Sequence, residues 1–410
     1  MDDQDSPARL KRALNLPLLT LYGLGSVIGA GIYALVGEIA GVAGYGAPLS
    51  FVVAAVVAGF TACSFAELAG RYPRAAGAAL YVQQGFGAPR LALAVGLLMT
   101  LAGTVSSAAL VNAFAGYFTN YVAAPAAAVV VVTAIGLAGL AAWGIAQSVA
   151  VAATITVVEI GGLVVVIGLG LPSLAELPAH GADFLPAPVG NAGIGAVLLG
   201  VTLAFYAFIG FEDMIDVAEE VKDVRLTMPR AILLTLGVST VLYALLMTTA
   251  LTTLTPAELA ASGAPLADLF RAHAGGSGLG MGVVAMFAIL NGALVQIVMA
   301  SRVLYGLSSR GQLPAILSRV HGGTRTPLIA TAIAGGAVLT LALIGDVGGL
   351  ASTTSLLILV VFAGVNLALW RIKGRLSAPE GAYTFPRSVP AAGFVLSSTF
   401  VLRELWLLVH

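Results

Sequence analysis

Charge is scarce in this 410-residue sequence. Charged residues make up 9% of the chain and hydrophobic residues 59%, whereas charged residues are about a quarter of an average soluble domain. The 19 basic and 19 acidic residues cancel, so the charge balance gives no sign of a nucleic-acid partner. This composition excludes an ordinary soluble domain and indicates an integral membrane protein surrounded by lipid.

Cysteine is almost absent too. Cys63 stands alone in an apolar run, which excludes a disulfide within the chain. The four histidines show no metal-ligand spacing, so we expect neither a metal site nor a cofactor. The connections between apolar runs are too short for a soluble catalytic module. We therefore expect a protein that is not an enzyme.

Long apolar runs are abundant. One crossing of a bilayer takes about 20 apolar residues. Runs of this length predict an all-α integral membrane protein with eleven transmembrane helices. The predicted spans are 16–38, 44–68, 91–118, 125–142, 148–171, 193–220, 229–253, 278–308, 327–344, 348–370 and 388–408.

Lysine and arginine sort to one side of these spans. Seventeen of the 19 basic residues fall on the side of the N-terminus, and only Arg271 and Arg403 fall on or near the other. Because cytoplasmic loops carry the excess of Lys and Arg, we expect residues 1–15 to be a cytoplasmic tail. The C-terminus is then extracytoplasmic, and the expected location is the cell membrane.

The first span contains an unusual density of glycine. Residues 21–35 read LYGLGSVIGAGIYAL, with Gly23, Gly25, Gly29 and Gly31 within nine positions. Glycine weakens a helix, so the stretch predicts a helix interrupted at the depth of the membrane. Close packing against another helix is the alternative, since Gly25 and Gly29 have the small-xxx-small spacing of helix contacts.

The sixth span carries a second candidate interruption. In FYAFIGFEDMIDVAEE, Gly210 is followed by Glu212, Asp213 and Asp216, and acids at this depth must face a cavity or a partner rather than lipid. Interrupted helices in corresponding halves are typical of secondary transporters with inverted repeats. Freed N–H groups there attract an anionic group and freed carbonyls attract an ammonium, so a zwitterion satisfies both.

Four ordered motifs resemble the amino acid–polyamine–organocation permeases, with the cationic and neutral amino-acid transporter branch as the nearest likeness. They are GSVIGAGIY in the first span, FAELAGRYPRAAGAALYV from Phe65, FYAFIGFEDMIDVAEEVKDVRLTMPRAI from Phe205 and ASRVLYGLSSRGQLP from Ala300. The resemblance covers nearly the whole chain. It departs in span number, since twelve helices are usual in the family.

The resemblance implies the leucine-transporter fold, a 5+5 inverted repeat with discontinuous helices 1 and 6. The first repeat would cover 16–175, the second 191–370, and residues 388–410 would form an eleventh helix. The family pattern places the substrate carboxylate on backbone N–H groups of the first span and the α-amino group on carbonyls of both interruptions. The implied substrate-binding residues are Val27, Gly29, Ala30, Gly31, Tyr206, Ala207, Ile209 and Gln296.

The most informative departure from the family is Glu159. A lysine commonly stands there, in the place where other relatives hold sodium beside the residue corresponding to Ser301. A glutamate could recruit sodium when ionised or carry a coupling proton itself; tying helices together is the alternative. We favour the proton, because no further hydroxyls cluster around Ser301. Glu212, Glu219 and Glu220 are expected to form a gating ion network.

The predicted function is secondary active transport by alternating access, as proton-coupled uptake of small or medium neutral amino acids. Two alternatives stay open: exchange or uptake of cationic amino acids or polyamines, and, in a different class, a passive ion channel. The expected partners are a small amino-acid substrate and the lipid bilayer, with no nucleic acid. The sequence does not determine the oligomeric state.

Overall fold

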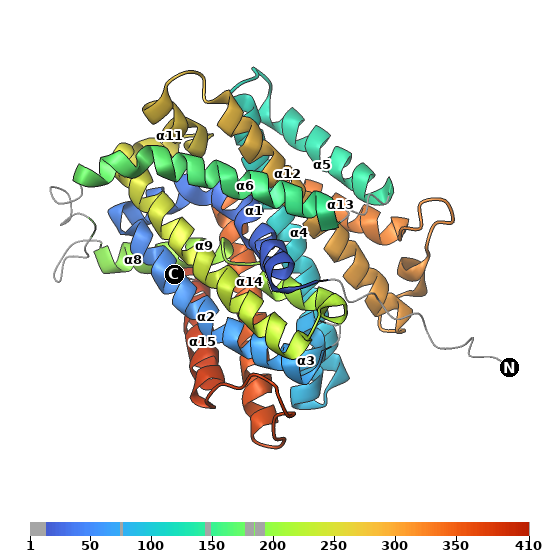
Figure 1. The fold of residues 1–410 in the computed structure, drawn as a ribbon. Coiled ribbons are helices and arrows are strands. Elements are labelled where there is room, and N and C mark those ends of the chain that lie inside the picture. The colour runs from blue at the N-terminus through green and yellow to red at the C-terminus, as the bar shows by residue number, and fades with distance from the viewer. Residues whose placement is uncertain (1–13, 74–76, 144–148, 177–183, 185–192, 410) are drawn as a thin grey trace.

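The computed structural model describes residues 14–73, 77–143, 149–176, 184 and 193–409, and helices joined by turns and irregular connections make up this part of the chain (Figure 1). The α-helices are α1 (Leu16–Ala43), α2 (Ala47–Arg71), α3 (Gly77–Phe86), α4 (Pro89–Thr119), α5 (Ala126–Trp143), α6 (Val149–Gly170), α8 (Gly193–Tyr206), α9 (Val224–Thr253), α10 (Pro256–Ala261), α11 (Pro265–Ala274), α12 (Leu279–Ser309), α13 (Leu328–Ile344), α14 (Val347–Lys373) and α15 (Ser388–Val409). Short 3-10 helices are η1 (Gly44–Gly46), η2 (Leu171–Glu176), η3 (Phe211–Glu220) and η4 (Ala315–Ser318).

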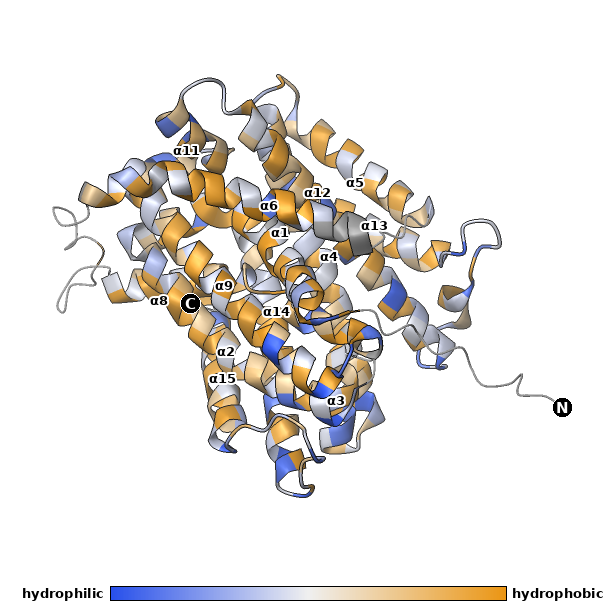
Figure 2. Ribbon diagram, in the orientation of Figure 1, coloured by the Kyte–Doolittle hydropathy of each residue, from blue (hydrophilic) through white to orange (hydrophobic). Residues whose placement is uncertain are grey.

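Eight of the described segments are long and apolar enough to cross a membrane. Hydrophobic residues predominate along the helices, and hydrophilic residues gather in the connections and at helix ends (Figure 2). Large apolar side chains such as Val132, Trp143 and Ile344 are exposed, as expected where lipid replaces water. The all-helical membrane architecture is therefore confirmed, whereas the count of eleven spans and the inverted repeat stay predictions.

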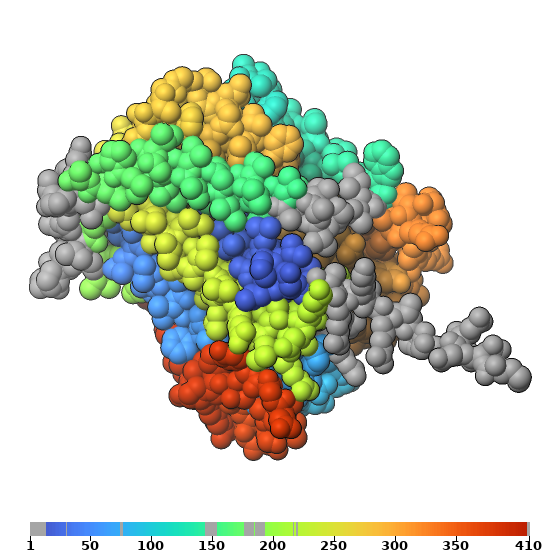
Figure 3. Space-filling model, in the orientation of Figure 1, coloured from blue at the N-terminus to red at the C-terminus, as the bar shows by residue number. Residues whose placement is uncertain are grey.

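The helix α1 lies inside the bundle. The helix α6 crosses α1 and α9 on one face of the molecule (Figures 1 and 3), and α1 also packs against α8, α10 and α12. Before its first turn, the Leu14 N–H donates to the Glu220 carbonyl at 3.0 Å, and the Lys222 N–H donates to the Leu14 carbonyl at 2.9 Å. The start of α1 is thereby tied to the end of η3.

The predicted interruption of the first span is wrong for this structure, because α1 is one helix from Leu16 to Ala43. Its glycines instead allow close approach. A Cβ on Gly31 would lie 3.0 Å from the Ala207 Cα, one on Gly23 would lie 2.5 Å from the Met214 Sδ, and one on Gly25 would overlap Thr156 Oγ1. The packing alternative therefore explains why this stretch lacks side chains.

The predicted interruption of the sixth span is confirmed. The helix α8 ends at Tyr206, residues 207–210 form turns, and η3 starts at Phe211. Gly210 has φ 123°, a conformation that a side chain strongly disfavours. A Cβ there would also lie 2.5 Å from the Ser26 carbonyl oxygen of α1. This glycine therefore both permits the break and lets it touch the first span.

Candidate functional site

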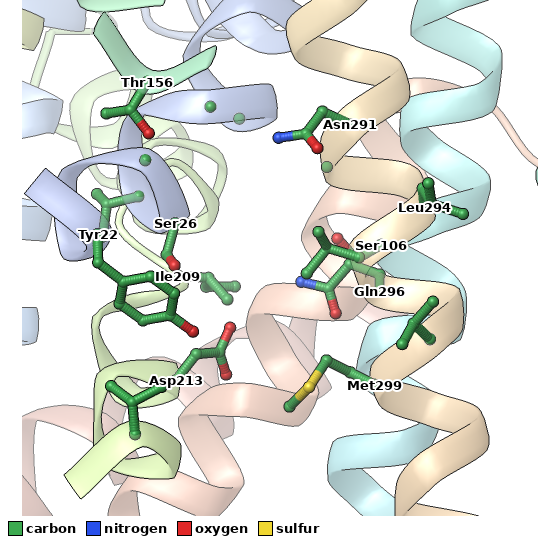
Figure 4. Close-up of a pocket in the computed structure, with 18 of the residues that line it drawn as sticks. Tyr22, Ser26, Ser106, Thr156, Ile209, Asp213, Asn291, Leu294, Gln296 and Met299 are labelled. Carbon is green, nitrogen blue, oxygen red and sulfur yellow. The ribbon is translucent and has the colours of Figure 1, made fainter. Parts of the chain in front are cut away.

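A cavity of 440 Å³ lies between α1, the break after α8, and the helices α4, α6 and α12. Figure 4 shows side chains from these elements pointing into it from two opposite sides. The lining residues include Leu14, Leu18, Tyr22, Gly25, Ser26, Val27, Gly29, Gly31, Ser106, Leu110, Thr156, Tyr206, Ile209, Asp213, Val217, Glu220, Asn291, Leu294, Gln296, Val298, Met299 and Arg302. The cavity thus follows α1 from its start to its midpoint and ends beside the interrupted helix.

Six of the eight residues predicted to bind substrate line this cavity. They are Val27, Gly29, Gly31, Tyr206, Ile209 and Gln296. Ala207 lies behind the wall, where it is fully buried and contacts Gly31 through its backbone. The side chain of Ala30 lies outside the described residues. The structure thus gathers these six positions around one space, and their part in binding stays a prediction.

The cavity is closed at one end. It reaches the exposed side chains of Leu18 and Arg302 near the start of α1. Beyond Gly31, the Ile32, Tyr33, Leu35 and Val36 side chains of α1 are fully buried. At this closed end the Tyr206 hydroxyl lies 2.8 Å from the Ser106 hydroxyl of α4. Tyr206 therefore joins the interrupted helix to α4 and forms part of the closure.

Two carbonyl groups near the cavity converge on one hydroxyl. Tyr243 of α9 donates to the Val27 carbonyl at 2.8 Å and lies 3.0 Å from the Ala207 carbonyl. Its ring is fully buried against Phe51 and Phe208. Sequence reasoning missed Tyr243, because it stands in an ordinary apolar run with no motif around it. The residue fixes the relative position of α1 and the break.

The variant Tyr243→Phe should lower the apparent affinity for substrate about three- to tenfold, because a net hydrogen bond contributes about 0.5–1.5 kcal/mol and the ring packing is retained. Uptake kinetics in proteoliposomes measure this. The matched control is Tyr117→Phe, which removes an equally buried hydroxyl bond of 3.0 Å to the Tyr33 carbonyl of the same helix, farther from the cavity. Equal changes in both variants would show that the position of Tyr243 has no special importance.

Glu159 lies behind the glycine-rich part of α1. Its side chain is 2% exposed, and neither carboxyl oxygen has a hydrogen-bond partner among the described residues. A Cβ placed on Gly29 would lie 3.6 Å from Glu159 Oε2, so the carboxyl group is adjacent to the cavity wall. The Tyr33 hydroxyl donates to the Glu159 backbone carbonyl at 2.5 Å, which holds α6 against α1 at this level.

The hydroxyl groups of Thr156 and Ser301 differ in their surroundings. Thr156, one turn earlier in α6, lines the cavity, and sequence reasoning did not single it out. Ser301 of α12 is buried, and its hydroxyl donates to the Val298 carbonyl of its own helix at 2.9 Å. The Ser301 hydroxyl is thus bonded within α12, whereas the Thr156 hydroxyl lies against Gly25 and the Glu159 carboxyl group lies against Gly29.

The acids after the break have separate positions. Glu212 Oε2 accepts a hydrogen bond of 2.9 Å from the Gly210 N–H and so satisfies a backbone donor freed at the break. Asp213 lines the cavity, and its side chain lies near Tyr22 (Figure 4). Glu220 lines the cavity near its mouth without an ion pair to another described side chain. The side chain of Glu219 lies outside the described residues, so the predicted ion network stays a prediction.

These features define a class of protein. A multi-pass helical bundle whose central cavity ends at an interrupted helix is the architecture of a membrane transporter. The chain belongs to the amino acid permease family, whose model matches residues 14–408. The resemblance inferred from the four motifs is thereby confirmed.

The chain is similar to transporters that are named for different substrates. An uncharacterized transporter of Mycobacterium tuberculosis is 34% identical over 89% of this chain and 81% of its own length. The branched-chain amino acid permease BcaP of Bacillus subtilis is 30% identical over 78% of this chain and 72% of its own. The vacuolar cationic amino acid transporter 4 of Arabidopsis thaliana is 28% identical over 92% of this chain and 65% of its own.

Proposed function

We propose that this protein takes up small or medium neutral amino acids together with protons, by alternating access. The observation that carries the proposal is the cavity between the glycine stretch of α1 and the break after Tyr206, with the carboxyl group of Glu159 beside it. Backbone polar groups at such a break are suited to the two charges of a zwitterion. The surrounding helices shield the site from lipid.

The substrate carboxylate is proposed to bind N–H groups between Gly29 and Gly31. Because α1 is helical there, these groups are engaged within the helix before substrate arrives. Each glycine makes the helix about 1 kcal/mol less favourable than alanine does, so a carboxylate can displace the local helical bonds at low cost. The α-amino group is proposed to bind the Val27 carbonyl and the freed carbonyls of the break.

The position of Glu159 supports the proposal of proton coupling. A carboxylate bound near Gly29 would face the Glu159 carboxyl group, and two unit charges 4 Å apart repel by about 4 kcal/mol at an effective dielectric constant of 20. Substrate therefore binds best when Glu159 is protonated. Release of substrate at the other side then favours loss of the proton, which gives symport without a metal ion.

The apolar lining of the cavity favours neutral substrates. Leu110, Ile209, Leu294 and Met299 line it, and their apolar surfaces suit an aliphatic or thioether side chain. The similarity to a branched-chain amino acid permease supports the same choice. Asp213 is the specific observation for the second candidate, uptake of cationic amino acids or polyamines, because its carboxylate lines the same cavity.

A competition experiment separates these two candidates. Uptake of labelled L-leucine by proteoliposomes should be reduced more by unlabelled alanine, serine and leucine than by arginine or putrescine at equal concentration. The expected ratio of inhibition constants is at least about tenfold, since an uncompensated cation in an apolar pocket costs more than 1.4 kcal/mol. Stronger competition by arginine or putrescine would assign Asp213 to substrate recognition and replace the neutral substrate class.

A further inference from the structure

A pair of charges lies within α15. Arg403 and Glu404 are adjacent, and their side chains are 23% and 16% exposed. They stand six and five residues before the end of the helix at Val409, which is about 8 Å by the helical rise of 1.5 Å per residue. The sequence predicts that α15 spans the membrane, and charged side chains within such a helix are costly and usually functional. The transport site described above does not include them.

Both charged side chains form hydrogen bonds with one turn of α8. Glu404 Oε1 accepts a hydrogen bond of 2.6 Å from the Thr202 hydroxyl. Arg403 Nη1 donates to Glu404 Oε1 at 2.8 Å and to the Leu198 carbonyl at 3.0 Å. Leu198 and Thr202 are four residues apart and so lie on one face of α8. Hydrogen bonds to charged groups are stronger than neutral ones, so this turn of α8 is firmly attached to α15.

The attached turn is the one before Tyr206. Thr202 and Tyr206 are again four residues apart, and α8 ends at Tyr206. Only the turns of residues 207–210 follow, in which the Ile209 N–H donates to the Tyr206 carbonyl at 3.1 Å. The Tyr206 hydroxyl meets the Ser106 hydroxyl at 2.8 Å. The position of Tyr206 at the closed end of the cavity therefore depends on how the preceding turn is held.

We propose that Arg403 and Glu404 are positioning residues of the transport site, which fix the last turns of α8 and thereby hold Tyr206 against Ser106. Neither residue lines the cavity in the described structure, so they act on substrate only through α8. The proposal rests on the proposed function, because it takes Tyr206 as part of the amino-acid site. Under this proposal, α15 contributes to transport through its bonds to α8, in addition to packing against α14 and α2.

The test is a double-mutant cycle on Thr202→Val and Ser106→Ala. Thr202→Val keeps the shape of the side chain and removes only the donor to Glu404. The KM for uptake into proteoliposomes is measured with the labelled amino acid that the wild type takes up best among L-alanine, L-leucine and L-arginine. Thr202→Ser is the rescue variant, since it keeps the hydroxyl. Thr240→Val is the control, because among the described residues the Thr240 hydroxyl bonds only to the Leu236 carbonyl of its own helix, at 2.7 Å.

Each single variant should raise KM about fivefold, and the double variant should also raise it about fivefold. Both changes release the contact between Tyr206 and Ser106, and effects of residues in one network are not additive. Thr202→Ser and Thr240→Val should keep KM within about twofold of wild type, the change left when independent contacts alone are affected. A KM raised about 25-fold in the double variant, as two independent fivefold effects would give, would overturn the proposal. So would a KM for Thr202→Val equal to that of Thr240→Val. A wild type that takes up none of the three amino acids would instead contradict the proposed function, and this proposal with it.

Discussion

The variant Glu159→Gln is expected to lose accumulation driven by a proton gradient while it still exchanges amino acids. Glutamine has nearly the shape of a protonated glutamate, so substrate binding beside Gly29 is retained. It cannot release a proton, so an imposed pH gradient has no group on which to act. Accumulation should fall at least about tenfold, to the level seen without a gradient, because the bound carboxylate and an ionised Glu159 repel by several kcal/mol in wild type.

Uptake under separate proton and sodium gradients measures this effect. The apparent affinity of wild type should weaken as pH rises, whereas that of Glu159→Gln should stay constant. Glu380→Gln is the matched control, since it makes the same chemical change at an exposed position outside the helices. If Glu159→Gln accumulates substrate as wild type does, Glu159 only ties helices together; if it loses sodium-driven uptake instead, the coupling ion is sodium.

The variant Gly31→Leu should abolish substrate binding. A Cβ at this position already lies 3.0 Å from the Ala207 Cα, tighter than nine in ten real Cβ contacts, and the neighbour is backbone that cannot rotate away. A leucine therefore forces α1 away from the break and fills the space in which the carboxylate is proposed to bind. Binding measured by a scintillation-proximity assay should fall more than about 100-fold, which corresponds to a loss above 2.7 kcal/mol.

Two further variants calibrate this result. Gly29→Ala fits sterically, since its Cβ makes only an ordinary contact with Glu159. It should weaken binding about fivefold by making the helix harder to open, as alanine favours helix by about 1 kcal/mol over glycine. Gly237→Leu places the same bulk in α9, where no atom lies within 4 Å of the added Cβ, and should bind normally. Normal binding by Gly31→Leu would place the carboxylate site elsewhere.

The sequence predicted the second interruption correctly and the first one wrongly, for one physical reason. Gly210 is followed by acids that cannot face lipid, so hydropathy and charge agree that the helix must break there. The glycines from Gly23 to Gly31 carry no such second signal, since missing side chains serve both a broken helix and a tightly packed one. Only the neighbours, such as Thr156 and Ala207, decide between these two outcomes, and they lie far away in sequence.

The candidate site likewise contains residues that the sequence indicates and residues that it does not indicate. Residues with a motif or an unusual charge, such as Tyr206, Gln296 and Glu159, could be found from the sequence. Tyr243 and Ser106 could not be assigned to the site, because a single hydroxyl in an apolar run usually bonds its own helix. Their importance comes from contacts with carbonyls and hydroxyls on other helices, which spacing along one helix does not encode.

Counterflow in proteoliposomes tests the central claim most directly. Vesicles containing wild-type protein are loaded with unlabelled L-leucine and diluted into labelled L-leucine, with no ion gradient. A transporter with one cavity of alternating access predicts transient accumulation of label above its equilibrium level, and Gly31→Leu should show none. Label that only equilibrates, at a rate independent of the internal leucine, would indicate a passive pore and contradict transport through this cavity.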